Sequence, residues 1–148
     1  MTSSSMTIST MIKLVLDTNV ILSGTVFGGM VEIIIDLIVE NKLQLFISPN
    51  LIKEVLEKLD KFKAGETSTT KTMTVLEAGE LVNPSVKIAV CRDPKDNYIL
   101  ELAETCKADY VITRDNDLLE LPNKRWKNTK IVKPEEFLSY LRRKKLLK

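Results

Sequence analysis

The chain has 148 residues, 44% of them hydrophobic and 28% charged, an ordinary composition for one soluble globular domain. It contains no histidine, which excludes Ser-His-Asp and Cys-His nucleophilic catalysis, imidazole acid–base chemistry and histidine-ligated metals. The two cysteines, Cys91 and Cys106, have no Cys-x-x-Cys spacing, as expected for a reduced cytoplasmic protein without a structural zinc site. Any catalysis must therefore depend on carboxylates, on lysine or on a metal ion with oxygen ligands.

The two ends of the chain differ in composition from its body. Residues 1–10 are rich in serine and threonine and lack the basic region and apolar core of a secretory signal, so we expect a flexible extension. Residues 142–148 include five Lys or Arg residues and are treated as a basic tail, which leaves the rest of the chain net acidic. No apolar run approaches the roughly 20 residues that span a bilayer, so we expect no association with a membrane.

The first predicted element is Leu14–Leu16, a continuous apolar run typical of a strand buried on both faces of a parallel sheet. Three glycines between residues 20 and 29 predict a loop, after which a helix extends from Met30 to about Asn41. A short strand at 43–47 and a helix that starts at 48–50 come next. The weaker signals that follow are a loop or frayed helix end at 61–72, a short helix at 73–80 and extended segments at 81–82 and 86–90.

The second half of the chain continues this alternation. Pro94 indicates a loop over residues 91–97, which leads into a helix at 98–106. Tyr110–Ile112 and 129–132 are predicted strands, and Pro134 opens the final helix at a favourable first-turn position. Strands that alternate with helices predict an α/β domain with a mainly parallel sheet.

Acidic residues follow both buried strands. Asp17 comes directly after the first strand, Asp115 and Asp117 follow the second, and Asp93 and Asp96 precede the helix that leads into the second. If the strands are parallel neighbours, these carboxylates meet at one edge of the sheet, where their repulsion raises their pKa values. The usual resolution is a hard divalent cation, Mg²⁺ or Mn²⁺. The alternative is that they only shape turns and cap a helix.

Four motifs, in this order and spacing, resemble those of the PIN domain family. They are Leu-Asp-Thr-Asn, Ser-Pro-x-Leu-x-x-Glu, Arg-Asp-Pro-x-Asp-Asn and Val-Ile-Thr-Arg-Asp-x-Asp-Leu-Leu. The resemblance covers about residues 11–141 and is strongest to the VapC-like toxins of prokaryotic toxin–antitoxin systems, of the PilT N-terminus type. It implies a three-layer α/β/α sandwich and a metal-dependent endoribonuclease that cuts single-stranded RNA. A bound Mg²⁺ or Mn²⁺ can stabilise a phosphoryl group and activate water, which needs no histidine.

The resemblance also assigns roles by position. The residues that match the four catalytic and metal-binding acids are Asp17, Glu54, Asp96 and Asp115. Two further acids, which would ligate a second ion or bind through water, are Asp93 and Asp117. The expected supporting residues are Asn19, which matches an asparagine beside the first acid, and Thr113 and Asn116, which either orient a phosphate or water or only form the turn.

Substrate and partner contacts are expected outside these acids. The best basic and aromatic patch, suited to unstacked bases and phosphates, comprises Lys124, Arg125, Trp126 and Lys127. The resemblance implies an antitoxin partner whose basic side chain blocks the acidic pocket. It also implies a homodimer that extends the RNA groove.

Three other functions compete with this one. A PIN-like module that binds RNA or protein without cutting would be expected to have lost acids, whereas this chain keeps all four. A housekeeping RNA-processing nuclease would carry the same acids as a toxin. Aspartate-nucleophile phosphatases have an Asp-x-Asp motif after the first strand. Position 19 of this chain is Asn, so the second Asp of that motif, the general acid, is missing.

Overall fold

The computed structural model describes residues 11–146, and six strands form its central sheet. The strands are β1 (Lys13–Leu16), β2 (Gln44–Ile47), β3 (Glu80–Leu81), β4 (Tyr110–Ile112), β5 (Arg125–Trp126) and β6 (Thr129–Val132). Their order across the sheet is β3-β2-β1-β4-β6-β5, and every neighbouring pair is parallel except β5 and β6. The prediction of a mainly parallel sheet is confirmed.

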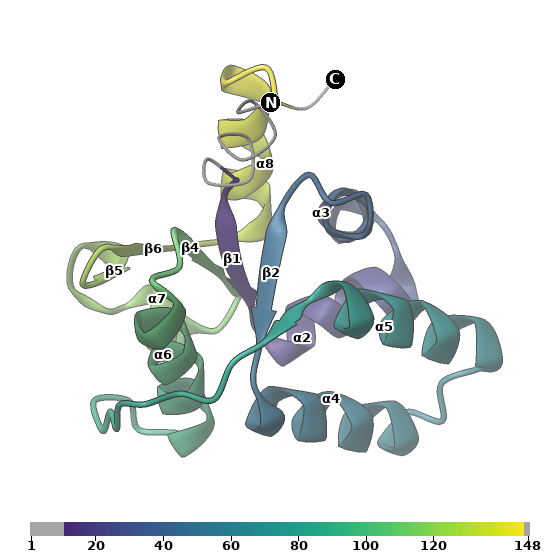
Figure 1. The fold of residues 1–148 in the computed structure, drawn as a ribbon, viewed down its shortest axis with the longest axis horizontal. Coiled ribbons are helices and arrows are strands. Elements are labelled where there is room, and N and C mark those ends of the chain that lie inside the picture. The colour runs from purple at the N-terminus through teal and green to yellow at the C-terminus, as the bar shows by residue number, and fades with distance from the viewer. Residues whose placement is uncertain (1–10, 147–148) are drawn as a thin grey trace, which may run out of the picture.

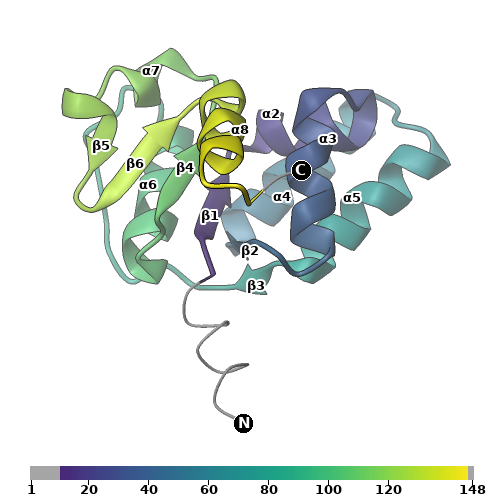
Figure 2. The same cartoon turned by 90° about the horizontal axis from the view of Figure 1, so that it is seen from above.

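Helical segments connect the strands and cover both faces of the sheet (Figures 1 and 2). They are α2 (Thr18–Leu22), a π-helical turn (Ser23–Phe27), α3 (Met30–Val39), α4 (Pro49–Lys61), α5 (Glu66–Ala78), α6 (Pro94–Cys106), α7 (Asn116–Leu119), a 3-10 turn (Pro122–Lys124) and α8 (Pro134–Arg143). α6 packs against β1, β2 and β4 on one side of the sheet, whereas α3 and α8 lie together on the other. The three-layer α/β/α arrangement is therefore as predicted.

β1 lies in the middle of the sheet and is buried on both faces. Leu14, Val15 and Leu16 are each 0% exposed. Successive side chains of a strand point to opposite faces, so this burial requires a helical layer on each side. β1 pairs with β4 so that Leu16 lies opposite Ile112. The two strands consequently end level with each other.

The chain after β1 is helical where the glycines predicted a loop. α2 and the π-helical turn follow Asp17 directly and bury apolar side chains such as Val20. Gly24 lies inside the turn, where a Cβ atom would stand 2.7 Å from Cγ1 of Ile35 in α3. This glycine permits a close helix contact and does not break the helix, so the loop prediction was wrong up to Phe27. Gly28 and Gly29, with φ of 76° and 75°, do form the predicted break before α3.

Helix α5 begins inside the segment that was predicted to be a loop or a frayed helix end. The hydroxyl oxygen of Thr72, which is 0% exposed, lies 2.8 Å from the carbonyl oxygen of Ser68 and 2.8 Å from Oγ1 of Thr25. Val75 is also fully buried. Serine and threonine have modest helix propensity, so the sequence signal was weak here and tertiary packing determines the helix.

Residues 83–91 form no strand, although an extended segment was predicted at 86–90. Three side chains of α6, spaced four residues apart, accept backbone N–H groups of this segment. The pairs are Thr105 Oγ1 with Ser85 (3.1 Å), Glu101 Oε2 with Ile88 (3.0 Å) and Asn97 Oδ1 with Cys91 (2.9 Å). These bonds satisfy the backbone in place of a sheet partner. We call residues 83–91 the strap.

Two predictions about the ends of the chain meet the structure only in part. The extension at 1–10 and the last two residues of the basic tail lie outside the described residues. The boundary predicted after Leu141 falls inside α8, which continues to Arg143.

Within residues 11–146, no single helix is long and apolar enough to cross a membrane. One bent pair, Thr18–Phe27 with Met30–Val39 at 98°, has the necessary length and composition when its two parts are taken together. Many apolar side chains of this pair belong to the hydrophobic core.

We predict that Leu102→Ala in α6 lowers the free energy of unfolding by about 2–5 kcal/mol, because it removes a side chain that is 0% exposed and leaves a cavity against the sheet. Urea unfolding followed by circular dichroism measures this change. Leu56→Ala in α4 is the matched helical control, since Leu56 is 41% exposed. Equal losses in both variants would contradict the placement of α6 on the sheet.

Candidate functional site

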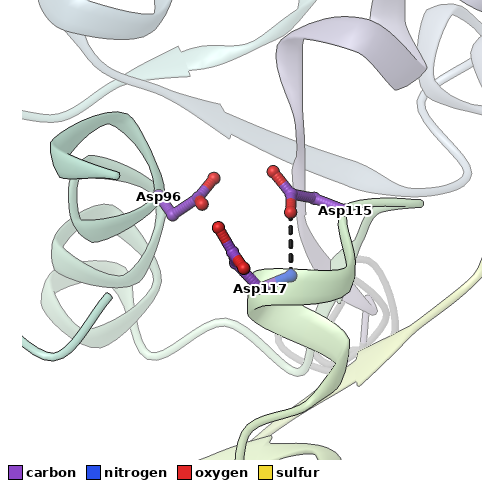
Figure 3. A group of neighbouring side chains, drawn as sticks. All are labelled: Asp96, Asp115 and Asp117. Atoms are coloured by element: carbon purple, nitrogen blue, oxygen red, sulfur yellow. Dashed lines mark hydrogen bonds between the residues drawn. The ribbon is translucent and has the colours of Figure 1, made fainter. Parts of the chain in front are cut away.

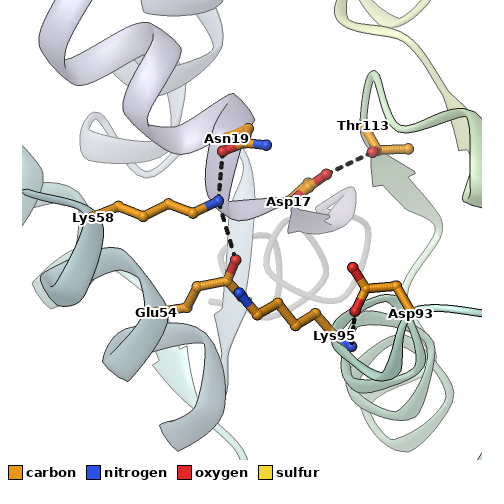
Figure 4. A network of polar contacts seen from close by, with 7 residues as sticks. All are labelled: Asp17, Asn19, Glu54, Lys58, Asp93, Lys95 and Thr113. Carbon is orange, nitrogen blue, oxygen red and sulfur yellow. Dashed lines mark hydrogen bonds and ion pairs between the residues drawn. The ribbon is translucent and has the colours of Figure 1, made fainter. Parts of the chain in front are cut away.

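Asp17 and Thr113 meet because β1 and β4 end level with each other. The backbone N–H of Asp17 still donates to the carbonyl oxygen of Ile112, at 3.1 Å. The hydroxyl of Thr113 donates to Oδ2 of Asp17 at 2.8 Å (Figure 4). The same hydroxyl oxygen accepts the backbone N–H of Asp115 at 2.9 Å. One buried threonine therefore positions both Asp17 and the turn that carries Asp115.

Three carboxylates converge next to this contact. Oxygen atoms of Asp96, Asp115 and Asp117 lie within 4.8 Å of one another, and Asp96 reaches them from α6 (Figure 3). Asp115 caps α7 by accepting the backbone N–H of Asp117 at 2.9 Å. On the outer side, Arg92 pairs with Oδ1 of Asp117 at 2.9 Å. Asp96 of α6 therefore lies beside the acids that follow β4, as expected for carboxylates that share one edge of the sheet.

Asp96 does not cap the helix that carries it. The residue that caps α6 is Asp93, whose Oδ1 accepts the backbone N–H of Lys95 at 3.0 Å. Asp96 is 5% exposed, and its Oδ2 is buried without a hydrogen-bond partner among the described residues. A buried carboxylate oxygen without a donor is energetically unfavourable unless a proton or a cation completes it.

The pKa values of two of these acids reflect their crowding. Burial raises the pKa of Asp96 to about 7, and the hydrogen bond and charge of Asp115 add to the effect. Burial also raises the pKa of Asp17, although the hydrogen bond from Thr113 opposes the rise. Both shifts penalise the ionised carboxylates in the metal-free protein. A cation bound among them would remove this penalty.

These acids open into a small polar pocket of about 130 Å³. Its lining consists of the carboxylates of Asp17, Glu54, Asp93, Asp96 and Asp115 together with Asn19, Lys58, Lys95 and Ile99. Glu54 comes from α4 and pairs with Lys58, whose Nζ lies 3.2 Å from its Oε2 (Figure 4). The pocket therefore has a wall on the α6 side that carries the acids and one lysine, Lys95, and an ion-paired wall on the α4 side.

The other predicted residues lie outside the pocket lining. Asn116 is the first residue of α7, and Asp117 belongs to the acidic cluster without lining the pocket. The predicted basic and aromatic patch lies in the 3-10 turn and at β5, on the outer edge of the sheet. There Trp126 Nε1 donates to Glu104 at 2.9 Å, and Lys127 lies 3.7 Å from the same carboxylate. Its role in binding RNA stays a prediction.

Sequence reasoning missed two lysines of the pocket and the polar side of α6. Lys58 follows Glu54 by four residues, a spacing that places both side chains on one face of a helix. Lys95 lies between two of the predicted acids. The sequence signal for the strap was the four-residue spacing of Asn97, Glu101 and Thr105. The hydrogen bonds of these side chains hold the chain in place just before Asp93.

We predict that Asp96→Asn stabilises the metal-free protein at neutral pH. The folded-state pKa of Asp96, about 7, exceeds the ordinary value of 3.8, so the native protein binds the proton more tightly and loses stability as the pH rises through this interval. The variant lacks that loss. Its advantage in urea unfolding with EDTA should be absent below about pH 4 and should grow until about pH 7. An advantage that does not vary with pH would contradict the assignment.

Comparison with known proteins agrees with this geometry. The PIN domain family model matches residues 13–117. Uncharacterized protein MJ1680 of Methanocaldococcus jannaschii is 35% identical over an alignment 140 residues long, and the match covers 86% of this chain and 90% of that protein. A chain in the crystal structure of VapBC2 from Rickettsia felis bound to a DNA fragment from their promoter has the same fold, with a TM-score of 0.59 and 17% identity over 82% of this chain and 98% of that chain. The chain belongs to the PIN domain family.

Proposed function

We propose that this protein is an endoribonuclease that uses Mg²⁺ or Mn²⁺ to hydrolyse phosphodiester bonds in single-stranded RNA. The observation that carries the proposal is the convergence of Asp96, Asp115 and Asp117 beside Asp17, at the carboxyl ends of two parallel strands. Ligands of open α/β sheets bind at this edge. Membership of the PIN domain family supports the same function.

The donor set suits a hard divalent cation. Apart from the ammonium of Lys95, which cannot ligate a metal, the charged groups of the pocket wall on the α6 side are carboxylates, whose oxygens Mg²⁺ and Mn²⁺ prefer. The buried Oδ2 of Asp96 has no protein donor among the described residues, so it is available as a ligand. We assign Asp17, Asp96 and Asp115 as the ligands of the ion. Glu54 is the fourth acid of the site and lies on the opposite wall. Asp93 and Asp117 are left to a second ion or to contacts through water.

A bound divalent ion would supply charge neutralisation at the phosphate and a lowered pKa for an attacking water. The residues of the protein hold the carboxylates in position. Thr113 holds Oδ2 of Asp17 and the backbone of Asp115, so the two carboxylates keep a fixed separation. Asp117 fixes the rotamer of Asp115 through its backbone N–H. Such preorganisation reduces the reorganisation that the reaction requires.

We further propose that the protein is the toxin of a toxin–antitoxin pair in the cytoplasm. The VapC-like motifs and the fold shared with the Rickettsia felis VapBC2 chain support this role. The pocket is acidic and small, so a basic side chain of an antitoxin would fit it and block access. A homodimer would extend the RNA groove beyond one pocket. A housekeeping RNA-processing role uses the same acids and differs in whether an antitoxin exists.

We predict that the purified protein cuts a mixed-sequence single-stranded RNA with Mg²⁺ or Mn²⁺ and is inactive in EDTA. Asp17→Asn and Asp96→Asn should each reduce the cleavage rate at least about a hundredfold, because each removes a charge from the ion site. Gel analysis of labelled RNA measures this rate. Asp36→Asn, on α3 and outside the pocket lining, is the matched control.

Two outcomes would count against the proposal. RNA binding without cleavage by the folded, metal-supplied protein would favour the non-cutting PIN-like module. Cleavage that survives both substitutions would show that the site lies elsewhere.

A further inference from the structure

Lys58 connects two walls of the pocket through its ammonium group. Nζ of Lys58 donates to Oδ1 of Asn19 at 2.8 Å and lies 3.2 Å from Oε2 of Glu54 (Figure 4). The side chains of Lys58 and Glu54 are 25% and 19% exposed, so this ion pair is shielded from solvent more than an ordinary surface pair. A lysine that only stabilised α4 would not need to contact α2, where Asn19 lies.

The ammonium group retains binding capacity. It has three N–H donors, and the contacts with Asn19 and Glu54 account for two of them. Lys58 lines the same pocket as the acids, so the third donor is available to a group that enters there. That pocket contains five carboxylates and two lysines, an arrangement that repels a polyanion unless a cation receives its phosphates.

The Lys58 contact also orients Asn19. An ammonium group only donates hydrogen bonds, so the amide oxygen of Asn19 must face Lys58 and its NH₂ group must point away. Figure 4 shows that NH₂ group directed to the side on which Asp17 lies. Lys58 therefore leaves two donors at the pocket, its own N–H and the Asn19 amide. Both suit the non-bridging oxygens of a phosphate.

We propose that Lys58 binds a backbone phosphate of the single-stranded RNA in the pocket, through its third N–H and beside the amide of Asn19. This inference rests on the proposed nuclease function and adds a substrate contact on the α4 wall, opposite the ion-binding acids. Glu54 and Asn19 hold the ammonium in place before the RNA arrives, which reduces the side-chain entropy lost on binding.

The test measures RNA affinity apart from cleavage. A fluorescent single-stranded RNA is titrated in Ca²⁺, a divalent cation that carboxylates bind, with a gel to check that the RNA stays intact. The proteins are the wild type, Lys58→Met, Lys58→Arg and Lys61→Met, each at several KCl concentrations. Lys58→Met should weaken binding about tenfold and lower the slope of log affinity against log salt by about 0.7, the value for one phosphate contact on a single strand. Lys58→Arg should stay within about threefold of wild type, since it keeps the charge and donors.

Lys61→Met is the matched control, because Lys61 is an exposed lysine of the same helix and its loss changes the net charge equally. It should bind as the wild type does. With Mg²⁺ and the same RNA as substrate, Lys58→Met should raise KM more than it lowers kcat. Melting temperatures of all four proteins report whether the substitution disturbs the fold.

Three results would overturn the proposal. Wild-type affinity and salt slope in Lys58→Met would show that Lys58 touches no phosphate. Equal loss in Lys58→Arg and Lys58→Met, with a lowered melting temperature, would make Lys58 a structural tie between α2 and α4. An equal loss of affinity in Lys61→Met would show that the loss in Lys58→Met comes from the change in net charge alone. Absence of cleavage by the wild type with an intact Lys58 effect on binding would instead reject the nuclease function alone.

Discussion

The site depends on the register between β1 and β4. Because Leu16 lies opposite Ile112, the residues directly after the two strands emerge together, and the hydroxyl of Thr113 can contact both Asp17 and the backbone of Asp115. A slip of one residue would turn every side chain of a strand to the other face. A slip would also place the charged Lys13 or Asp17 where a buried leucine now lies, which the apolar core disfavours, so the packing of the interior fixes the spacing of the acids.

Much of this arrangement was predictable from the sequence, because the strongest local signals and the tertiary structure agree. The uninterrupted run Leu14–Leu16 requires burial on both faces, and the acids after it and after β4 must then share one sheet edge. Ser48 and Pro49 start α4 as their types suggest, since Ser48 Oγ accepts the backbone N–H of Leu51 at 3.2 Å. The motif order then supplied the family, which the family model confirms.

The parts that sequence reasoning missed are those that tertiary contacts determine. Gly24 signals a loop by type, but here it lets the π-helical turn approach α3. Thr72 is a poor helix former whose burial against Thr25 outweighs its propensity. The contact of Lys58 with Asn19, which joins α4 to α2 at the pocket, was not predicted either. Pairings between side chains on different elements have no local signature.

The central claim is that the acids after β1 and β4 and the buried acid of α6 hold one divalent cation. Anomalous diffraction from crystals soaked in Mn²⁺ tests it most directly, with an Asp96→Asn crystal as the comparison. The account predicts a manganese peak within about 2.5 Å of a carboxylate oxygen of Asp96 and near those of Asp17 and Asp115, and its loss in the variant. An undiminished peak in the variant, or manganese bound away from all three acids, would contradict it.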